Sequence, residues 1–174
     1  MTAPAQCIDP ATEVVAVAMG ELRALFDPAG PCPPEGTGTT TVRFFASDGG
    51  LPFWDGMCKE PFLWVRVQQR YRSTTASFPN AFVADNSCGS GSIRVLALEL
   101  GVARCSSHEA KPTWSKLEKE AQVSLDDSWR IENALCRIVR KLRSKSRAVG
   151  TDSIAPTGPE GGVMAWTGVV YVQF

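Results

Sequence analysis

The sequence has one histidine, two tyrosines, no net charge and no long apolar run. Eighteen Lys and Arg residues balance eighteen Asp and Glu residues among 174, so any contact with a polyanion must be local. The longest apolar run, Val14–Met19, is far shorter than a membrane span, and we expect no membrane partner. No basic stretch followed by an apolar one opens the chain, so we expect a protein made and folded in a cytoplasm.

Signatures of catalysis are also missing. The sequence has neither a phosphate-binding G-x-x-x-x-G-K-[ST] loop nor a G-x-S-x-G nucleophile elbow. His108 lies three residues after Cys105, but no acid that would orient a Cys–His pair is identifiable. Asp126 and Asp127 are adjacent at a possible helix start, where they do not face each other as an acid–base pair must. We therefore expect no enzyme, no catalytic residue and no cofactor.

Six cysteines are present, but none stands in a C-x-x-C pair of the kind that indicates zinc. An even number permits disulfides, whereas a cytoplasmic origin favours reduced thiols. We expect free cysteines, several of them buried, and no metal site.

The composition is that of an ordinary globular protein, with 44% hydrophobic and 21% charged residues. The length suffices for one domain with a core of its own. We predict a single domain over residues 1–174, with an N-terminal arm over residues 1–9.

Two long segments of alternating character organise the chain. In Phe62–Arg72, Leu63 and Val65 begin an apolar face. In Ile93–Arg104, alternate positions are leucine or valine, which predicts an antiparallel partner for the first segment. The opposite face of the first segment carries Trp64, Arg66, Arg70 and Arg72.

The remaining elements are shorter or helical. Asp9-Pro10 begins a helix that ends at Asp27, and Thr41–Ala46 is a short strand. Apolar residues between Leu117 and Leu142 predict a second helix, or a short helix followed by a longer one from about Ser124. Val163–Phe174 alternates and forms a closing strand.

Two segments lack periodicity. Residues 73–92 form a long protruding loop in which Phe78 and Phe82 could anchor a neighbour, or a mobile tip without a partner. Residues 148–162 are a linker to the closing strand. These elements predict an α+β domain: a mainly antiparallel sheet of about four strands with a long hairpin, packed by an N-terminal helix and a helix in the C-terminal half.

The arginines suggest places of contact. A sheet face with Trp64, Arg66, Arg70 and Arg72 should not be sealed in a core; it could be solvated, pair with a neighbouring subunit or face DNA. The end of the second helix is also basic, which suits the helix dipole in solvent or, alternatively, a polyanion. Its cations are Arg137, Arg140, Lys141, Arg143, Lys145 and Arg147.

Several segments together resemble neck and tail-completion proteins of actinobacterial siphophages, and the order of elements is similar to that of lambda-like tail terminators. The segments are PFLWVRVQQRYRS, FPN, IRVLALELGVARC, LDDSWRIENALCRIVRKL and GPEGGVMAWTGVVYVQF, within a resemblance that runs from Asp9 to Phe174.

The resemblance implies a virion protein that forms a ring, a hexamer, at the head-proximal end of the tail tube. Such a ring stops tube polymerisation and docks the DNA-filled head. The implied partners are other copies of the chain, the tail-tube protein, a head-completion or stopper protein, and DNA passing through the lumen without sequence-specific binding. The alternatives are a head-closure or head–tail adaptor protein of the neck and, in a different class, a small nucleic-acid-binding module.

Overall fold

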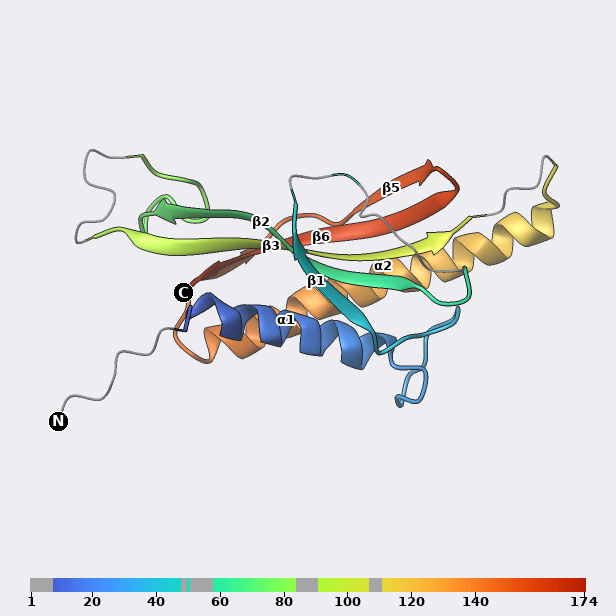
Figure 1. Cartoon of the computed structure of the whole chain (residues 1–174), viewed down its shortest axis with the longest axis horizontal. Helices are drawn as coiled ribbons and strands as arrows, with labels where there is room; N and C mark the ends of the chain where they lie inside the picture. Colours follow the sequence, from blue (N-terminus) through green and yellow to red (C-terminus); the bar gives the residue numbers. More distant parts are fainter. Residues whose placement is uncertain (1–7, 48–49, 51–57, 84–90, 107–110) are drawn as a thin grey trace.

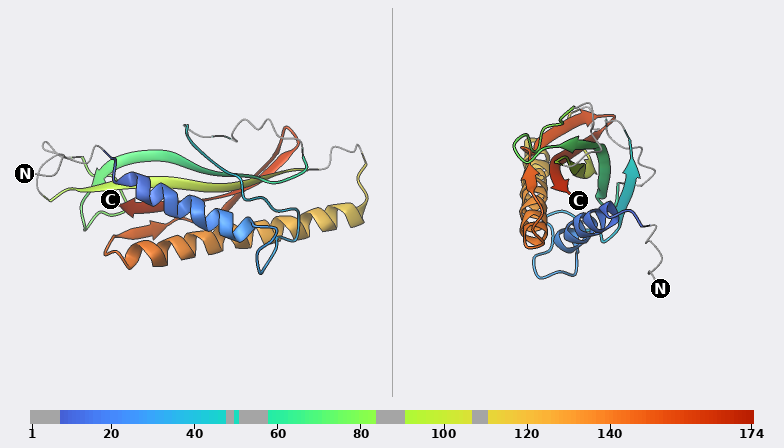
Figure 2. Two further views of the ribbon diagram at one scale, coloured as in Figure 1. Left: turned by 60° about the horizontal axis from the view of Figure 1, so that its bottom comes forward. Right: turned by 90° about the vertical axis from the view of Figure 1, so that its left-hand side faces the viewer.

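A computed structural model describes residues 8–47, 50, 58–83, 91–106 and 111–174 (Figure 1). Two helices lie side by side on one face of a long, curved sheet (Figures 1 and 2). The elements in chain order are α1 (Ala11–Phe26), β1 (Val42–Ala46), β2 (Phe62–Ser73), β3 (Ile93–Cys105), α2 (Trp114–Arg143), β4 (Val149–Thr151), β5 (Ala155–Glu160) and β6 (Val163–Gln173). The α+β prediction with two helices is confirmed.

The sheet is mixed, with six strands in place of the four or so expected. Its order is β1-β2-β3-β6-β4, and β5 pairs with the other part of β6. Only β1 and β2 run parallel, so the sheet is mainly antiparallel. The two extra strands, β4 and β5, come from the segment 148–162 that we predicted to be a linker. They are short and rich in Gly and Pro, so they carry no alternation of their own and depend on β6 for pairing.

The predicted hairpin of β2 and β3 is present, with Val65 opposite Leu100 and Val67 opposite Leu98. Its register shifts between Val67 and Gln69, because a bulge places one extra residue in β2. Beyond the bulge, side chains of β2 exchange faces.

The core lies between the helices and the sheet. The apolar stripe of α1 is buried, as its helical spacing predicted; its members are Val14, Val15, Ala18, Leu22, Leu25 and Phe26. In α2 only the C-terminal half is buried in this way, through Ile131, Ile138 and Leu142. The second helix is continuous, without the break at Asp126-Asp127 that we kept open. Within the described ranges, neither helix is both long and apolar enough for a bilayer span.

Candidate interaction surfaces

Trp64 and Arg66 lie on the sheet face away from the helices, and both are buried. The guanidinium of Arg66 donates to Glu99 on β3 at 2.6 Å and to the Gly50 carbonyl at 2.8 Å. The Trp64 indole donates to the other oxygen of Glu99 at 2.9 Å. The expectation that this face should not be sealed is therefore wrong for Trp64 and Arg66, because Glu99 supplies a buried counter-charge.

The sequence carried a signal for this arrangement. Glu99 interrupts a run of leucines and valines, and Gly101 follows two residues later on the same face. Gly101 stands opposite Trp64 in the register, and a β-carbon there would lie 2.1 Å from the indole. Because Gly101 has no side chain, the Trp64 ring fits against it, and the Glu99 carboxylate accepts a hydrogen bond from the indole N–H.

Arg70 and Arg72 do not project with Arg66, contrary to the sequence prediction. The bulge in β2 moves both arginines to the helix-side face, where Arg70 stands opposite Leu96. Arg72 donates to Ser92 at 3.5 Å. The three arginines thus form no single basic face.

Arg70 belongs instead to a cluster at the end of the sheet, with Arg94, Phe174 and Asp9. Both Arg70 and Arg94 lie over the Phe174 ring, with their guanidinium carbons 4.5 and 5.2 Å from its centre. Arg70 also donates to both oxygens of Asp9, at 2.7 and 2.6 Å. These hydrogen bonds, with one from the Ala11 amide, lower the pKa of the Asp9 carboxyl.

The basic end of α2 faces acids of α1. Arg137 and Lys141 pair with Glu21, the former at 3.9 Å. Lys145 and Arg147 pair with Glu13, and their hydrogen bonds lower the pKa of that carboxyl. Arg143 donates to the carbonyl of Val149, and Arg140 is exposed. The cluster therefore carries less net positive charge than its sequence suggests.

The loop after β2 is described as far as Val83. Phe78 is half-buried beside β4, where a β-carbon on Gly150 would lie 3.4 Å from its ring. Phe82 is exposed, and its amide donates to the Arg72 carbonyl at 2.8 Å. The two predicted anchors thus differ: Phe78 packs against its own chain, whereas Phe82 is accessible.

Two further arginine sites, one buried and one partly buried, were not predicted from the sequence. Arg130 on α2 donates to Asp126 at 2.7 Å and to the carbonyls of Leu25, Cys32 and Pro33, so it holds the end of α1 and the segment after it. The sequence signal for this site was the pattern Asp-Asp-x-x-Arg, in which Asp126 and Arg130 stand one helical turn apart. The second Asp of the pattern, Asp127, belongs to the other site.

The second site joins β3 to α2. Arg104 donates to both oxygens of Asp127, at 2.6 and 2.9 Å. Burial raises the pKa of Asp127, and the hydrogen bond from Arg104 opposes that shift. Asp126 and Asp127, which we expected at a possible helix start, therefore lie inside a continuous helix, and each forms an ion pair with an arginine.

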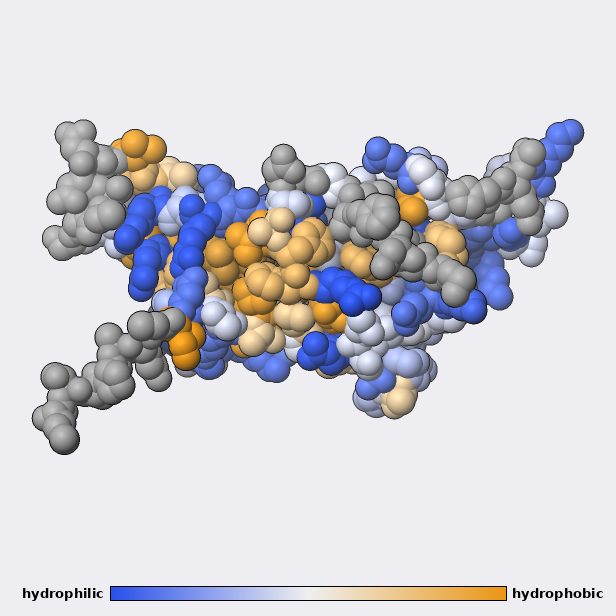
Figure 3. Space-filling view, viewed as in Figure 1, coloured by the Kyte–Doolittle hydropathy of each residue, from blue (hydrophilic) through white to orange (hydrophobic). Residues whose placement is uncertain are grey.

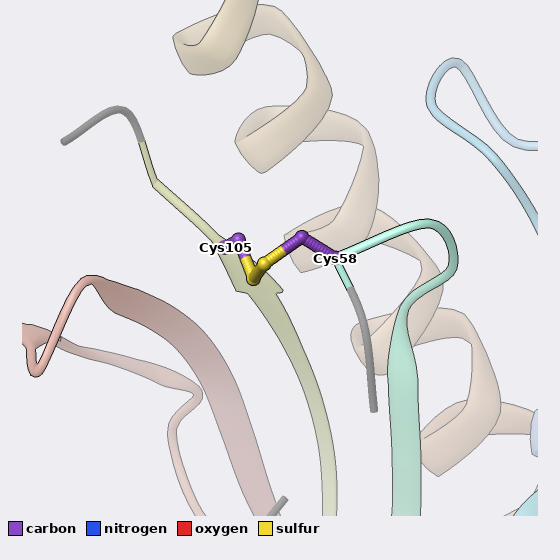
Figure 4. Close-up of a disulfide and its surroundings, with 2 residues drawn as sticks. All are labelled: Cys58 and Cys105. Carbon is purple, nitrogen blue, oxygen red and sulfur yellow. A yellow bond between two sulfur atoms is a disulfide. The ribbon is translucent and has the colours of Figure 1, made fainter. Parts of the chain in front are cut away.

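A disulfide joins Cys58 to Cys105 (Figure 4), contrary to the expectation of free thiols. Cys58 comes shortly before β2 and Cys105 ends β3; because these strands are antiparallel, the two cysteines meet, with their α-carbons 5.5 Å apart. Cys32 and Cys136 are free but exposed rather than buried. Cys7 and Cys88 lie outside the described residues.

The disulfide also bears on the Cys–His hypothesis. Cys105 has no free thiol here to act as a nucleophile, and His108 lies outside the described residues. A mainly apolar cavity of about 270 Å³ adjoins Cys105, between the end of the sheet and the N-terminal half of α2. Its lining includes Val123, Met164 and Trp166.

The N-terminal half of α2 exposes a row of apolar side chains at successive turns of the helix. We call it the α2 stripe: Trp114, Leu117, Ala121, Leu125 and Trp129. The exposed fractions are 86% for Trp114, 70% for Leu125 and 47% for Trp129. Another exposed aromatic side chain, Phe44, lies on β1, where Figure 3 shows apolar surface in the middle of the face.

In the part of the chain that the structure describes, no group of three or more His, Cys, Asp and Glu side chains is arranged to hold a metal ion. No protein-family model matches the chain, and the comparison with curated proteins finds no match. A function must therefore be argued from these surfaces and from the sequence itself.

Proposed function

We propose that this chain is a structural protein of a phage virion: the tail terminator, which forms a hexameric ring at the head-proximal end of the tail tube. The ring stops polymerisation of the tube and joins the tail to the head. The protein acts through contacts with other proteins, without a cofactor.

The observation that carries this proposal is the α2 stripe. Large apolar side chains exposed in a continuous row, and bordered by polar residues, are typical of a protein–protein interface. Trp is also the residue type most enriched among those that dominate binding energy. Trp114 and Trp129, at the two ends of the row, give the stripe this character.

The sequence adds support through its resemblance to neck and tail-completion proteins of siphophages. That resemblance includes the helix LDDSWRIENALCRIVRKL, to which Leu125 and Trp129 of the stripe belong. The order of helix, short strand, long hairpin, helix and closing strand is found again among the elements of the structure, with two short strands added.

In this proposal, DNA passes through the lumen of the ring. The exposed Arg94, in the cluster with Phe174 and the Arg70–Asp9 pair, would suit its phosphates. The tail-tube protein and a head-completion protein occupy the two ends of the ring. The protein is assembled in the host cytoplasm and ends in the neck of the virion.

The test is to mix the purified protein with growing tail-tube protein and to follow the products by light scattering and negative-stain imaging. We expect rings of about six subunits, seated on tube ends that no longer elongate. Binding to DNA-filled heads, with no effect on tubes, would instead support a head-closure or adaptor protein.

The same cluster of Arg70, Arg94 and Phe174 favours the second candidate, a nucleic-acid-binding module, because cations beside an aromatic ring suit a nucleotide. Such a module would bind DNA with an affinity that falls steeply as salt increases. Two measurements separate this module from a terminator: DNA affinity at several salt concentrations and binding to tube ends. A steep dependence on salt together with no binding to tube ends would favour the module.

A further inference from the structure

The α2 stripe and the edge strand β1 lie on opposite flanks of the molecule. In the end-on view of Figure 2, α2 forms one flank, β1 forms the other, and α1 and the rest of the sheet lie between them. Two different surfaces on opposite sides permit a head-to-tail contact between copies, in which every copy uses one surface on each side.

The α2 stripe points away from the other elements that pack on α2. Arg137 and Lys141 mark the side of the helix that faces α1, because both reach Glu21. Ile131 and Ile138 mark the side that faces the sheet. At 3.6 residues per turn, the stripe lies roughly 90° or more around the helix from both sides, and so faces outward.

The β1 flank offers a complementary surface. Among the described residues β1 pairs only with β2, so its outer edge is open to a neighbour. Phe44 is 49% exposed on this strand, and Arg43 beside it is exposed as well. Arg23 of α1 is held at the same flank, because it donates to the carbonyl of Thr40 just before the strand.

The charged residues beside the α2 stripe and beside β1 are complementary in sign. Two exposed glutamates, Glu118 and Glu132, border the α2 stripe. On the other flank two arginines are exposed: Arg43 precedes Phe44 in β1, and Arg23 reaches the Thr40 carbonyl just before that strand. A contact between these flanks would set acids against bases. A contact of the α2 stripe with another α2 stripe in parallel would set Glu118 and Glu132 against their own copies.

The area is also adequate for the centre of an interface. From the usual size of aromatic and leucine side chains, the exposed stripe amounts to on the order of 400 Å² of apolar surface. A stable interface buries about 800 Å² on each partner, with an apolar centre and a polar rim. The stripe fits that centre, and the charged residues beside it fit the rim.

We infer that the α2 stripe of one copy packs against the β1 edge of the next copy, with Leu125 and Trp129 near Phe44 and with Glu118 and Glu132 near Arg23 and Arg43. This inference rests on the proposed ring and names the seam between its subunits.

The test uses two variants that each disable one flank, Leu125→Asp and Phe44→Asp. Both residues are exposed, and circular dichroism checks that each variant is folded. We expect the wild-type protein to assemble and each variant alone to stay monomeric, as measured by light scattering. An equimolar mixture should form a species of twice the 18.8 kDa chain mass and no larger one, because only one intact seam remains.

The matched control is Lys119→Asp, which places the same side chain on an exposed position of α2 outside the stripe. It should assemble like the wild type. A Phe44→Asp variant that still assembles, or folded variants whose mixture stays monomeric, would overturn the inference. So would a wild-type protein that is monomeric even at millimolar concentration.

The two proposals fail in different ways. Rings that cap tubes but are insensitive to both substitutions would remove this seam and leave the terminator function in place. Assembly that depends on Leu125 and Phe44 but leaves tube ends uncapped would keep the seam and remove the terminator function.

Discussion

Arg66 and Glu99 show how one pair of residues decides what a sheet face can do. Arginine on a strand usually indicates solvent, but here its charge is met by a carboxylate on the neighbouring strand at 2.6 Å. The side chains are only 4% and 7% exposed, and Trp64 and Gln68 donate to the same carboxylate. This part of the sheet face, around Trp64, Arg66 and Glu99, is therefore interior and not accessible to DNA.

Removing one member of this pair should be costly. We predict that Glu99→Gln lowers the free energy of unfolding by about 3–5 kcal/mol, because a buried guanidinium then lacks its counter-charge. Urea unfolding monitored by tryptophan fluorescence measures the loss. The double variant Arg66→Met/Glu99→Leu should recover most of it, since it leaves no unpaired charge. A cost below about 1 kcal/mol for E99Q would contradict the role of the pair.

Asp9 and Glu13 should make the stability of the fold depend on pH. Hydrogen bonds from Arg70 lower the pKa of Asp9 below its ordinary value, and those from Lys145 and Arg147 do the same for the pKa of Glu13. Lowered values in the folded state favour folding above the ordinary pKa, and this contribution is lost as pH falls through the folded-state pKa. Asp127, whose pKa is raised, acts in the opposite sense and weakens folding as pH rises.

The corresponding experiment compares Asp9→Asn with the wild type in urea unfolding from pH 7 down to below pH 3. We expect the variant to be less stable at pH 7 and the difference to shrink towards zero in acid. A difference that is the same at every pH would mean that the Asp9–Arg70 contact does not act through its charge.

At the scale of elements, α2 has two parts with different tasks. Its C-terminal half completes the core, whereas its N-terminal half carries the exposed stripe. Arg130 lies near their boundary. Its guanidinium donates to the Asp126 carboxylate, to the Leu25 carbonyl of α1 and to two carbonyls of the following segment. It fixes α1 against α2 at the point where α1 ends.

Replacing Arg130 should release that end. We predict that Arg130→Met destabilises the fold by about 3 kcal/mol or more, because the buried Leu25 carbonyl and the Asp126 carboxylate lose a charged donor. Denaturant unfolding gives the magnitude, and limited proteolysis should cut the segment after α1 sooner. Arg137→Met is the control: its pair with Glu21 is long and half-exposed, so its loss should cost less than about 1 kcal/mol. Equal effects of the two substitutions would contradict the assignment.

At the scale of the whole molecule, the disulfide closes a long loop of the chain. Cys58 and Cys105 are 47 residues apart and enclose both strands of the hairpin. A cross-link of this span restricts the unfolded chain more than the folded one, which stabilises the fold. It also ties the start of β2 to the end of β3, beside the apolar cavity that adjoins Cys105.

We predict that Cys58→Ser/Cys105→Ser lowers the free energy of unfolding by about 2–4 kcal/mol. Thermal unfolding of the wild type with and without a reductant provides the comparison, and the reduced wild type should match the double variant. Cys32→Ser and Cys136→Ser, at exposed free thiols, should change little. A reductant that leaves the melting temperature unchanged would show that the bond contributes nothing to stability.

Local patterns were enough to predict the α+β class, both helices, β1, the hairpin and β6, because each of these elements has a period or a start signal within its own residues. The same patterns predicted the buried stripe of α1. They could not predict β4 and β5, which need β6 to pair with. Nor could they predict the faces of Arg70 and Arg72, because a single inserted residue in β2 exchanges those faces. Only the tertiary structure shows which residues pair with Arg66, Arg104 and Arg130 and that Cys58 pairs with Cys105. Contacts between segments far apart in the chain produce no periodic pattern in the local sequence. The accessible row on α2 likewise exists only because α1 and the sheet cover the other sides of that helix.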